Sequence, residues 1–284
     1  MQTSLPAIAQ AARKDKTKRF RGLYSMLNRH NLKVAFQAIR KGAATGVDGV
    51  TYREYEMNLS DNLADLEQRL KEKRYRAKLV KRVFIPKSNG KLRPLGIPAL
   101  EDKIVQYVVR EILETLFEPL FLACSYAYRP YRSARMAVEK LRDELSGKYT
   151  WVVESDISGF FDNVNHDWML KMLERRVNDN ALIGLIRKWL RAGILQPDGA
   201  VDHPERGTPQ GSIISPILAN IYLHYVLDLW FEQEVKKYFG GNATLIRYAD
   251  DFVVDFRYHK DAAHFKKILP VRMKKFNLEL AEDK

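Results

Sequence analysis

The sequence predicts an α+β fold in which helices alternate with antiparallel β-hairpins. A stripe of leucines has the three-and-four spacing of one buried helical face: Leu59, Leu63, Leu66 and Leu70. Asn89-Gly90 separates two extended runs, which is a strong signal for a hairpin turn. A second pair of strands is expected within 245–256, around two adjacent aspartates. With 284 residues, 46% of them apolar, the chain can bury a sizeable core in one domain or in two packed lobes.

The other elements follow from hydrophobic periodicity and from turn residues. Helices are expected over 24–41, 59–70, 102–116, 166–176, 181–191 and 215–234. The candidate apolar positions of the first helix are Leu23, Leu27, Val34, Ala38 and Ile39. The last helix begins at Ser215-Pro216, an N-cap followed by proline at the first helical position. Strands are expected over 80–86, 91–97 and 149–154, the third of them buried, and the stretch 193–207 is expected to turn or extend.

The chain is strongly basic. Lys and Arg total 48 against 35 Asp and Glu, which gives a formal charge of +13 and a pI near 9.6. This balance favours a polyanionic partner such as a nucleic acid, although a basic solvated surface has the same composition. Six basic residues lie within 11–21, a segment expected to pack weakly or to await a partner.

The cysteine content and the hydropathy of the sequence indicate the cellular compartment of the protein. Cys124 is the single cysteine, so no disulfide can form within the chain, and its apolar neighbours favour a core position over a nucleophile. No run approaches the ~18 apolar residues of a membrane span, and no secretory signal opens the sequence. The sequence therefore predicts a cytoplasmic protein with no membrane partner.

Two acidic motifs carry the chemistry. Asp250 and Asp251 interrupt an apolar, strand-like run, and Asp156 follows the strand expected over 149–154. A hairpin turning at the adjacent pair presents both carboxylates at a sheet edge, where Mg²⁺ prefers a few carboxylates plus substrate phosphates. An exposed Asp-Asp turn is the alternative for that pair alone. Nucleotidyl transfer uses two metals, which carboxylates from separate strands could hold, but sequence alone does not bring Asp156 to the pair.

Several ordered blocks together resemble the fingers and palm of a bacterial group II intron reverse transcriptase, also called a maturase. The blocks are Gly46–Gly49, Ile85–Pro98, Asp156–Asp162, Gly207–Gly211 and Tyr248–Asp251. The resemblance implies a right-hand polymerase fold with an antiparallel palm sheet backed by helices. It implies a basic N-terminal extension over 1–24, fingers over 25–148, and mostly palm over 149–284, with 166–206 partly in the fingers. The thumb and the maturase domain are expected to be absent.

The resemblance also implies roles for individual residues. Asp156, Asp250 and Asp251 would be catalytic and bind two Mg²⁺ ions, with Mn²⁺ as a substitute and Asp250 the more direct ligand of the adjacent pair. The nucleotide pocket would consist of Lys87 and Arg93 on the triphosphate, Phe161 under the sugar, where it excludes a 2′-hydroxyl, and Gln210. Template or RNA contacts would come from Arg29, Arg129, Pro209 and Gly211. Phe160 is expected in the core.

The implied activity is RNA-templated DNA synthesis. The implied partners are group II intron RNA, an RNA template with a DNA primer, and dNTPs, and a homodimer is compatible with them. One alternative is an RNA-binding splicing cofactor without polymerase activity. Another is a related reverse transcriptase outside introns, defence-associated or diversity-generating. Ser212 and Ala127 depart from residues usual in the family, so template fit is expected to differ more than chemistry.

Overall fold

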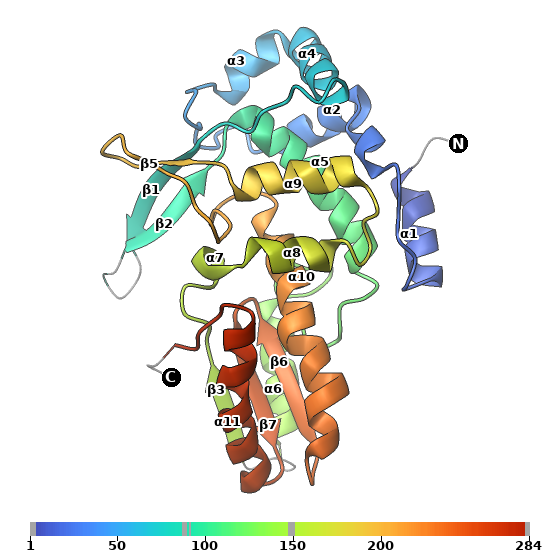
Figure 1. Ribbon diagram of the computed structural model, residues 1–284, viewed down its shortest axis with the longest axis vertical. Coiled ribbons are helices and arrows are strands. Elements are labelled where there is room, and N and C mark those ends of the chain that lie inside the picture. Colours follow the sequence, from blue (N-terminus) through green and yellow to red (C-terminus); the bar gives the residue numbers. More distant parts are fainter. Residues whose placement is uncertain (1–3, 87–89, 91, 147–150, 282–284) are drawn as a thin grey trace. The chain divides into compact units, whose positions relative to one another are not determined.

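The computed structural model describes residues 4–86, 90, 92–146 and 151–281. The chain divides into two compact units, each built from two segments (Figure 1). The first unit comprises Met1–Pro119 and Leu173–Ser215, and the second comprises Leu120–Met172 and Pro216–Lys284. No helix among the described residues is both long and apolar enough to cross a membrane.

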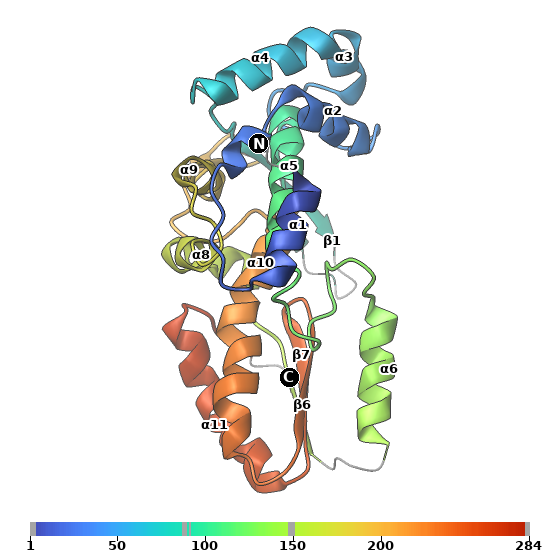
Figure 2. The ribbon, with the colours of Figure 1, turned by 90° about the vertical axis from the view of Figure 1, so that its right-hand side faces the viewer.

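The first unit is built around α5 (Leu100–Phe117), whose apolar residues are buried nearly all the way round. Helices α1 and α2 pack against α5 (Figure 2). The predicted leucine stripe lies on α4, where Leu63, Leu66 and Leu70 are buried, so that prediction is confirmed. The other helices of this unit are α1 (Leu5–Lys14), η1 (Leu23–Met26), α2 (Arg29–Ala38), α3 (Tyr52–Met57), α4 (Leu59–Lys71) and α9 (Asn180–Leu190).

The single helix predicted over 24–41 is wrong, because two short helices occupy this stretch. The side chain of Asn28 accepts a hydrogen bond from the backbone N–H of Asn31 at 3.0 Å and starts α2 afresh. An asparagine that caps a helix in this way stabilises a new N-terminus and not a continuous helix. Val34 is consequently 48% exposed, whereas Leu32 and Phe36 form the buried face.

The basic N-terminal segment packs more closely than predicted. Ala12 is buried on α1, and Phe20 is only 7% exposed. The backbone N–H of Phe20 donates to the carbonyl of Arg176 at 2.7 Å, and the Arg176 guanidinium donates to the carbonyls of Ala12 and Asp15. The prediction of weak packing is therefore wrong here, because an arginine from a distant segment satisfies the carbonyls at the end of α1.

A four-stranded sheet completes the first unit, in the order β2-β1-β4-β5. The predicted basic hairpin is confirmed as antiparallel β1 and β2, in which Ile85 pairs with Arg93. The tip residues 87–89 and 91 lie outside the described residues. Two short strands from the stretch 193–207 extend the sheet. The strands are β1 (Val80–Pro86), β2 (Leu92–Ile97), β4 (Ile194–Leu195) and β5 (Val201–Asp202).

The second unit contains an antiparallel three-stranded sheet between helices, which confirms the α+β prediction. Its order is β3 (Trp151–Ser155), β7 (Asp251–Phe256) and β6 (Ala243–Tyr248). Helix α11 (His259–Lys275) covers one face and α6 (Ala134–Leu145) the other (Figure 2). The rings of Phe256 and Phe265 meet on the α11 side, with their centroids 5.5 Å apart. Two shorter helices, α7 (Phe160–Asn163) and α8 (His166–Leu173), follow β3.

Two predictions for this unit need correction. The strand predicted as buried is β3, an edge strand on which Trp151 is 45% and Val152 50% exposed. The helix predicted to run from Ser215 through 234 changes character at His224. It consists of α10 (Ser215–Leu223), the π-helical segments η2 (His224–Asp228) and η3 (Phe231–Val235), and the 3-10 turn η4 (Lys236–Tyr238).

Candidate active site

The adjacent aspartates lie at a two-residue hairpin turn between β6 and β7, Asp250 within the turn and Asp251 at the start of β7. The last paired residues are Tyr248 and Asp251, so Ala249 and Asp250 form the turn. Ala249 has φ of +59°, in the left-handed region. This conformation costs a residue with a Cβ roughly 1–2 kcal/mol and persists where neighbouring structure enforces it. The turn therefore places both aspartates at one end of the sheet.

Asp156 reaches the same end of the sheet from β3. The last pair between β3 and β7 is Ser155 with Phe252, so Asp156 and Asp251 are the next positions on the two strands. The backbone of Asp156 is fixed, because its carbonyl accepts the N–H of Ala281 at 2.9 Å. One carboxylate oxygen of Asp156 also accepts the N–H of Ile157 at 2.9 Å. The fold thus brings Asp156 to the same end of one sheet as an aspartate pair that is far from it in the sequence.

The electrostatics of this cluster favour a cation. Burial raises the pKa of Asp250, and the negative charges of Asp156 and Asp251 raise it further, while Arg247 acts in the opposite direction. A cation at the cluster would offset that repulsion, and carboxylate oxygens are the ligands that hard divalent ions prefer. Across residues 4–86, 90, 92–146 and 151–281, no three His, Cys, Asp or Glu side chains are grouped closely enough to hold a metal ion. The three carboxylates therefore fit a hard divalent cation by the chemistry of their oxygen atoms, and not by a coordination geometry already in place.

Phe161 lies in the same unit as the aspartates, on the short helix α7. It is half-buried, and its ring meets that of Phe160 edge to face at 5.4 Å. Phe160 is 2% exposed and also contacts Tyr222, which confirms its predicted core position. Of the two neighbouring rings, Phe161 is thus the one that retains an accessible surface.

Other predicted nucleotide and template residues belong to the first unit. Arg93 is exposed on β2, and Lys87 lies outside the described residues. The backbone N–H of Gly96, on the same strand, donates to the carbonyl of Gln210 at 2.6 Å. A Cβ at Gly96 would lie 2.9 Å from the Cβ of Pro209, so glycine permits the close approach of the turn. Gly211, exposed with φ of +103°, completes this turn against β2.

The two arginines predicted to contact RNA differ in their surroundings. The Nη1 atom of Arg129 donates to the carbonyls of Leu122 and Ser125, at 2.7 and 2.8 Å. Arg29 begins α2 with its side chain 55% exposed, and its Nε lies 3.8 Å from a carboxylate oxygen of Glu67. Arg129 therefore organises its own loop, whereas Arg29 presents charge at the surface.

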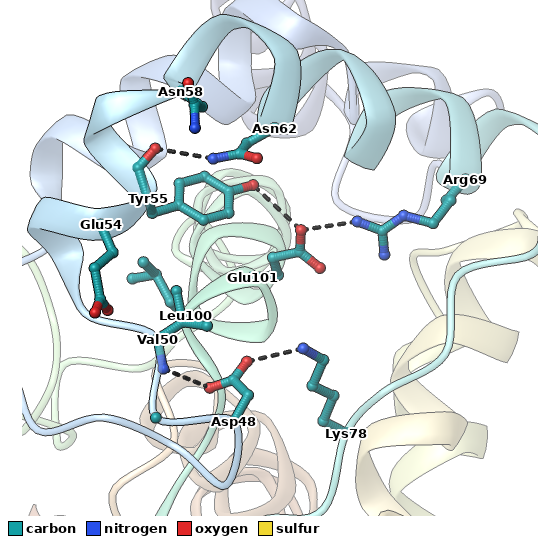
Figure 3. Close-up of a pocket in the computed structure, with 11 residues that line it drawn as sticks. Asp48, Val50, Glu54, Tyr55, Asn58, Asn62, Arg69, Lys78, Leu100 and Glu101 are labelled. Carbon is teal, nitrogen blue, oxygen red and sulfur yellow. Dashed lines mark hydrogen bonds and ion pairs between the residues drawn. The ribbon is translucent and has the colours of Figure 1, made fainter.

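Asp48 and Gly49, from the block Gly46–Gly49, line a pocket of about 730 Å³ in the first unit (Figure 3). Four of its charged lining residues form two pairs: Lys78 donates to Asp48, and Arg69 donates to Glu101, each at 2.8 Å. A Cβ at Gly46 would lie 2.5 Å from the backbone of Ala99, just before α5. These contacts give the block a structural part in joining its loop to the start of α5.

No role was predicted for Arg247 from the sequence, although it lies beside the aspartate pair. Its side chain is completely buried, and one of its N–H groups donates to the carbonyl of Ala249 in the turn. The available signal was a charged residue inside the apolar strand 243–248, where burial demands hydrogen-bond partners.

Comparison with known proteins places this site in a family. Residues 85–284 match the family model described as reverse transcriptase (RNA-dependent DNA polymerase). Protein YkfC of Escherichia coli K12 is 36% identical, over 75% of this chain and 64% of its own length. The group II intron-encoded protein LtrA of Lactococcus lactis subsp. cremoris is 37% identical, over 74% of this chain and 36% of its own length. The chain thus spans less than two thirds of either relative.

Structural comparison supports the right-hand fold. The apo telomerase of Candida tropicalis matches 73% of this chain and 43% of its own, with a TM-score of 0.57 and 15% sequence identity. At that identity the likeness concerns the fold, and it agrees with the mixed helices and antiparallel sheets described above. The family match covers both acidic motifs and the Gly207–Gly211 block. The chain belongs to the reverse transcriptase family.

Proposed function

We propose that this chain is the polymerase core of a group II intron-encoded RNA-directed DNA polymerase. In the proposed reaction a primer 3′-hydroxyl attacks the α-phosphate of a dNTP, and pyrophosphate leaves. The observation that carries the proposal is the meeting of Asp156, Asp250 and Asp251 at one end of the second unit's sheet. A cation would offset the repulsion that raises the pKa of Asp250, and phosphoryl transfer needs cations at the reacting phosphates.

The cofactor we propose is a pair of Mg²⁺ ions, for which Mn²⁺ can substitute. Asp156, Asp250 and Asp251 are the residues that would hold them, with Asp251, exposed at the start of β7, the more peripheral ligand. When bound, such ions activate the attacking hydroxyl and stabilise the leaving phosphates. The protein's own contribution is to fix the backbone that carries these carboxylates, as the bond from Ala281 does for Asp156.

We propose nucleotide-binding roles for residues of each unit, taken separately. In the first unit, Arg93 would hold the triphosphate with its planar guanidinium, and Lys87 would add a point charge. Gln210 would contact the nucleotide from the turn bonded to Gly96. In the second unit, the partly exposed ring of Phe161 would lie under the sugar and exclude a 2′-hydroxyl.

The proposed macromolecular partners are an RNA template with a DNA primer and, in a second role, group II intron RNA. The charge of +13 supports a polyanionic partner, and Arg29, Arg129, Pro209 and Gly211 are the proposed contacts. We assign the first unit mainly to the fingers, with 1–24 as its extension, and the second to the palm. The proposed location is the cytoplasm, where a second copy of the chain could also assemble.

Primer extension tests the proposal. The protein, in its natural full length, would be given poly(rA) with oligo(dT) and dTTP, in Mg²⁺ and separately in Mn²⁺. Asp250→Asn should abolish extension, whereas Asp162→Asn, an exposed acid on α7, should leave it intact. An RNA-binding splicing cofactor without polymerase activity would bind RNA but extend no primer with either ion. That result would refute the proposal.

A further inference from the structure

A completely buried arginine lies two residues before the catalytic turn. All five N–H donors of Arg247 are used, which is the full capacity of a guanidinium. Two donate to the Asp228 carboxylate at 2.6 and 2.7 Å, and one donates to the Ser125 hydroxyl at 2.9 Å. The remaining two, both on Nη1, donate to the Asn220 side chain at 3.2 Å and to the Ala249 carbonyl at 2.9 Å.

The partners of Arg247 are themselves fixed. Asp228 is completely buried at the end of the π-helical segment η2. Such widened turns often occur at functional sites, because they redirect a side chain out of the regular helical pattern. The backbone of Arg247 is held too, since its N–H donates to the Cys124 carbonyl at 2.8 Å and its own carbonyl accepts from Tyr126 at 3.0 Å. The guanidinium therefore has one available position.

A buried ion pair of this kind is weak support for stability, because desolvating both charges offsets their attraction. The ion pair matters here because it fixes the direction of the Arg247 side chain. Ala249 is held in the left-handed region, which is unfavourable for alanine, and the Arg247 bond to its carbonyl ties that residue to the rigid network. The next two residues are Asp250 and Asp251, so the orientation of this peptide sets where both carboxylates point.

We propose that Arg247, aligned by Asp228, is a positioning residue that locks the Ala249-Asp250 turn and so holds Asp250 facing Asp156. This inference rests on the proposed polymerase function and adds a residue to its site. It differs from a purely structural role, in which Arg247 variants would lose stability while the folded molecules kept their metal affinity and turnover.

The test compares two conservative variants of equally buried arginines. Arg247→Lys keeps a positive charge beside Asp228 but lacks the fork that reaches the Ala249 carbonyl at the same time. Arg176→Lys is the matched control, because Arg176 is 1% exposed and also donates to two carbonyls, those of Ala12 and Asp15. A second variant, Arg247→Met with Asp228→Leu, replaces the ion pair by apolar side chains of similar volume and protects the test against misfolding.

Two assays are carried out on the folded fraction of each protein, which circular dichroism and thermal unfolding define. The first is kcat and KM for dTTP in primer extension, and the second is Mn²⁺ binding followed by electron paramagnetic resonance without nucleotide or primer. Both Arg247 variants should lower kcat about 100-fold at unchanged KM, the scale expected when reacting groups are displaced by about 1 Å. They should also weaken Mn²⁺ binding, while Arg176→Lys changes neither quantity.

The outcomes separate this inference from the function on which it rests. If the parent extends primers and both folded Arg247 variants keep its kcat and Mn²⁺ affinity, the positioning role is refuted and the polymerase stands. If Arg247→Lys does not fold, the apolar pair decides by the same two measurements. A parent that extends no primer refutes the polymerase, and Mn²⁺ binding alone then decides whether Arg247 orients the carboxylates.

Discussion

Asp255 offers a quantitative prediction about pH and stability. It lies on β7, the central strand of the second unit's sheet, between Thr244 and Val152 on the neighbouring strands. Its side chain is completely buried, and neither carboxylate oxygen has a hydrogen-bond partner within the described part of the chain. Burial raises the pKa of Asp255 from 3.8 to about 6, and the charge of Glu144 adds to this. Between pH 3.8 and about 6, the folded state therefore holds a proton on Asp255 that the unfolded state has already released.

The sign and size of the effect follow from that difference. The stability contributed by protonated Asp255 is complete below pH 3.8 and is lost as the pH rises through about 6. A difference of about 2.2 pKa units corresponds to about 3 kcal/mol. Asp255→Asn removes the titration while keeping the shape of the side chain. Between pH 4 and pH 8 the variant should gain about 2 kcal/mol in unfolding free energy relative to the parent, most of the full effect.

Urea unfolding at several pH values between 4 and 8 measures this gain. Asp198→Asn is the control, because Asp198 is exposed and an amide oxygen can still accept its bond from the Ala200 N–H. Asp198→Asn reports what an Asp-to-Asn change does at an exposed position. If the difference between Asp255→Asn and the parent depends on pH no more than this control does, the reasoning about Asp255 is refuted.

Three further predictions concern the first unit. Gly96→Ala should reduce primer extension with little loss of secondary structure, because the new Cβ would meet Val80 at 2.6 Å and displace Pro209; an unchanged kcat/KM for dTTP would contradict this. Leu66→Ala should lower the unfolding free energy by about 2–5 kcal/mol in urea titrations, since Leu66 is fully buried in the stripe on α4. Leu59→Ala should lower the unfolding free energy less, because Leu59 is only half-buried. Thr51→Ala should cost about 1 kcal/mol in the same titrations by removing the capping box of α3, whereas Thr51→Ser should restore it.

Local patterns in the sequence predicted local structure well. The hairpin of β1 and β2 follows from Asn89-Gly90 and two extended runs, and the stripe on α4 follows from leucine spacing. The break at Asn28 was missed because apolar residues continue on both sides of it, while the capping bond depends on one side chain. The exposure of β3 was missed because apolar residues alone do not distinguish an edge strand from a central one.

The parts of the site that lie within short sequence motifs could be predicted from the sequence. The turn at Asp250 follows from two acids inside an apolar run, but the approach of Asp156 depends on β3 pairing with β7, a contact between distant segments. The network of Arg247 draws on Ser125, Asn220 and Asp228, and no spacing rule connects these three positions. Long-range hydrogen bonds of this kind appear only when the fold is known.

The bond between Gly96 and Gln210 has a mechanical consequence. Because the turn of Gln210 is fastened to the strand that carries Arg93, any swing of the hairpin carries both side chains together. If Arg93 holds the triphosphate and Gln210 contacts the nucleotide, as proposed, these two contacts cannot be adjusted separately by moving one loop. A nucleotide that draws Arg93 inward would then also move Gln210.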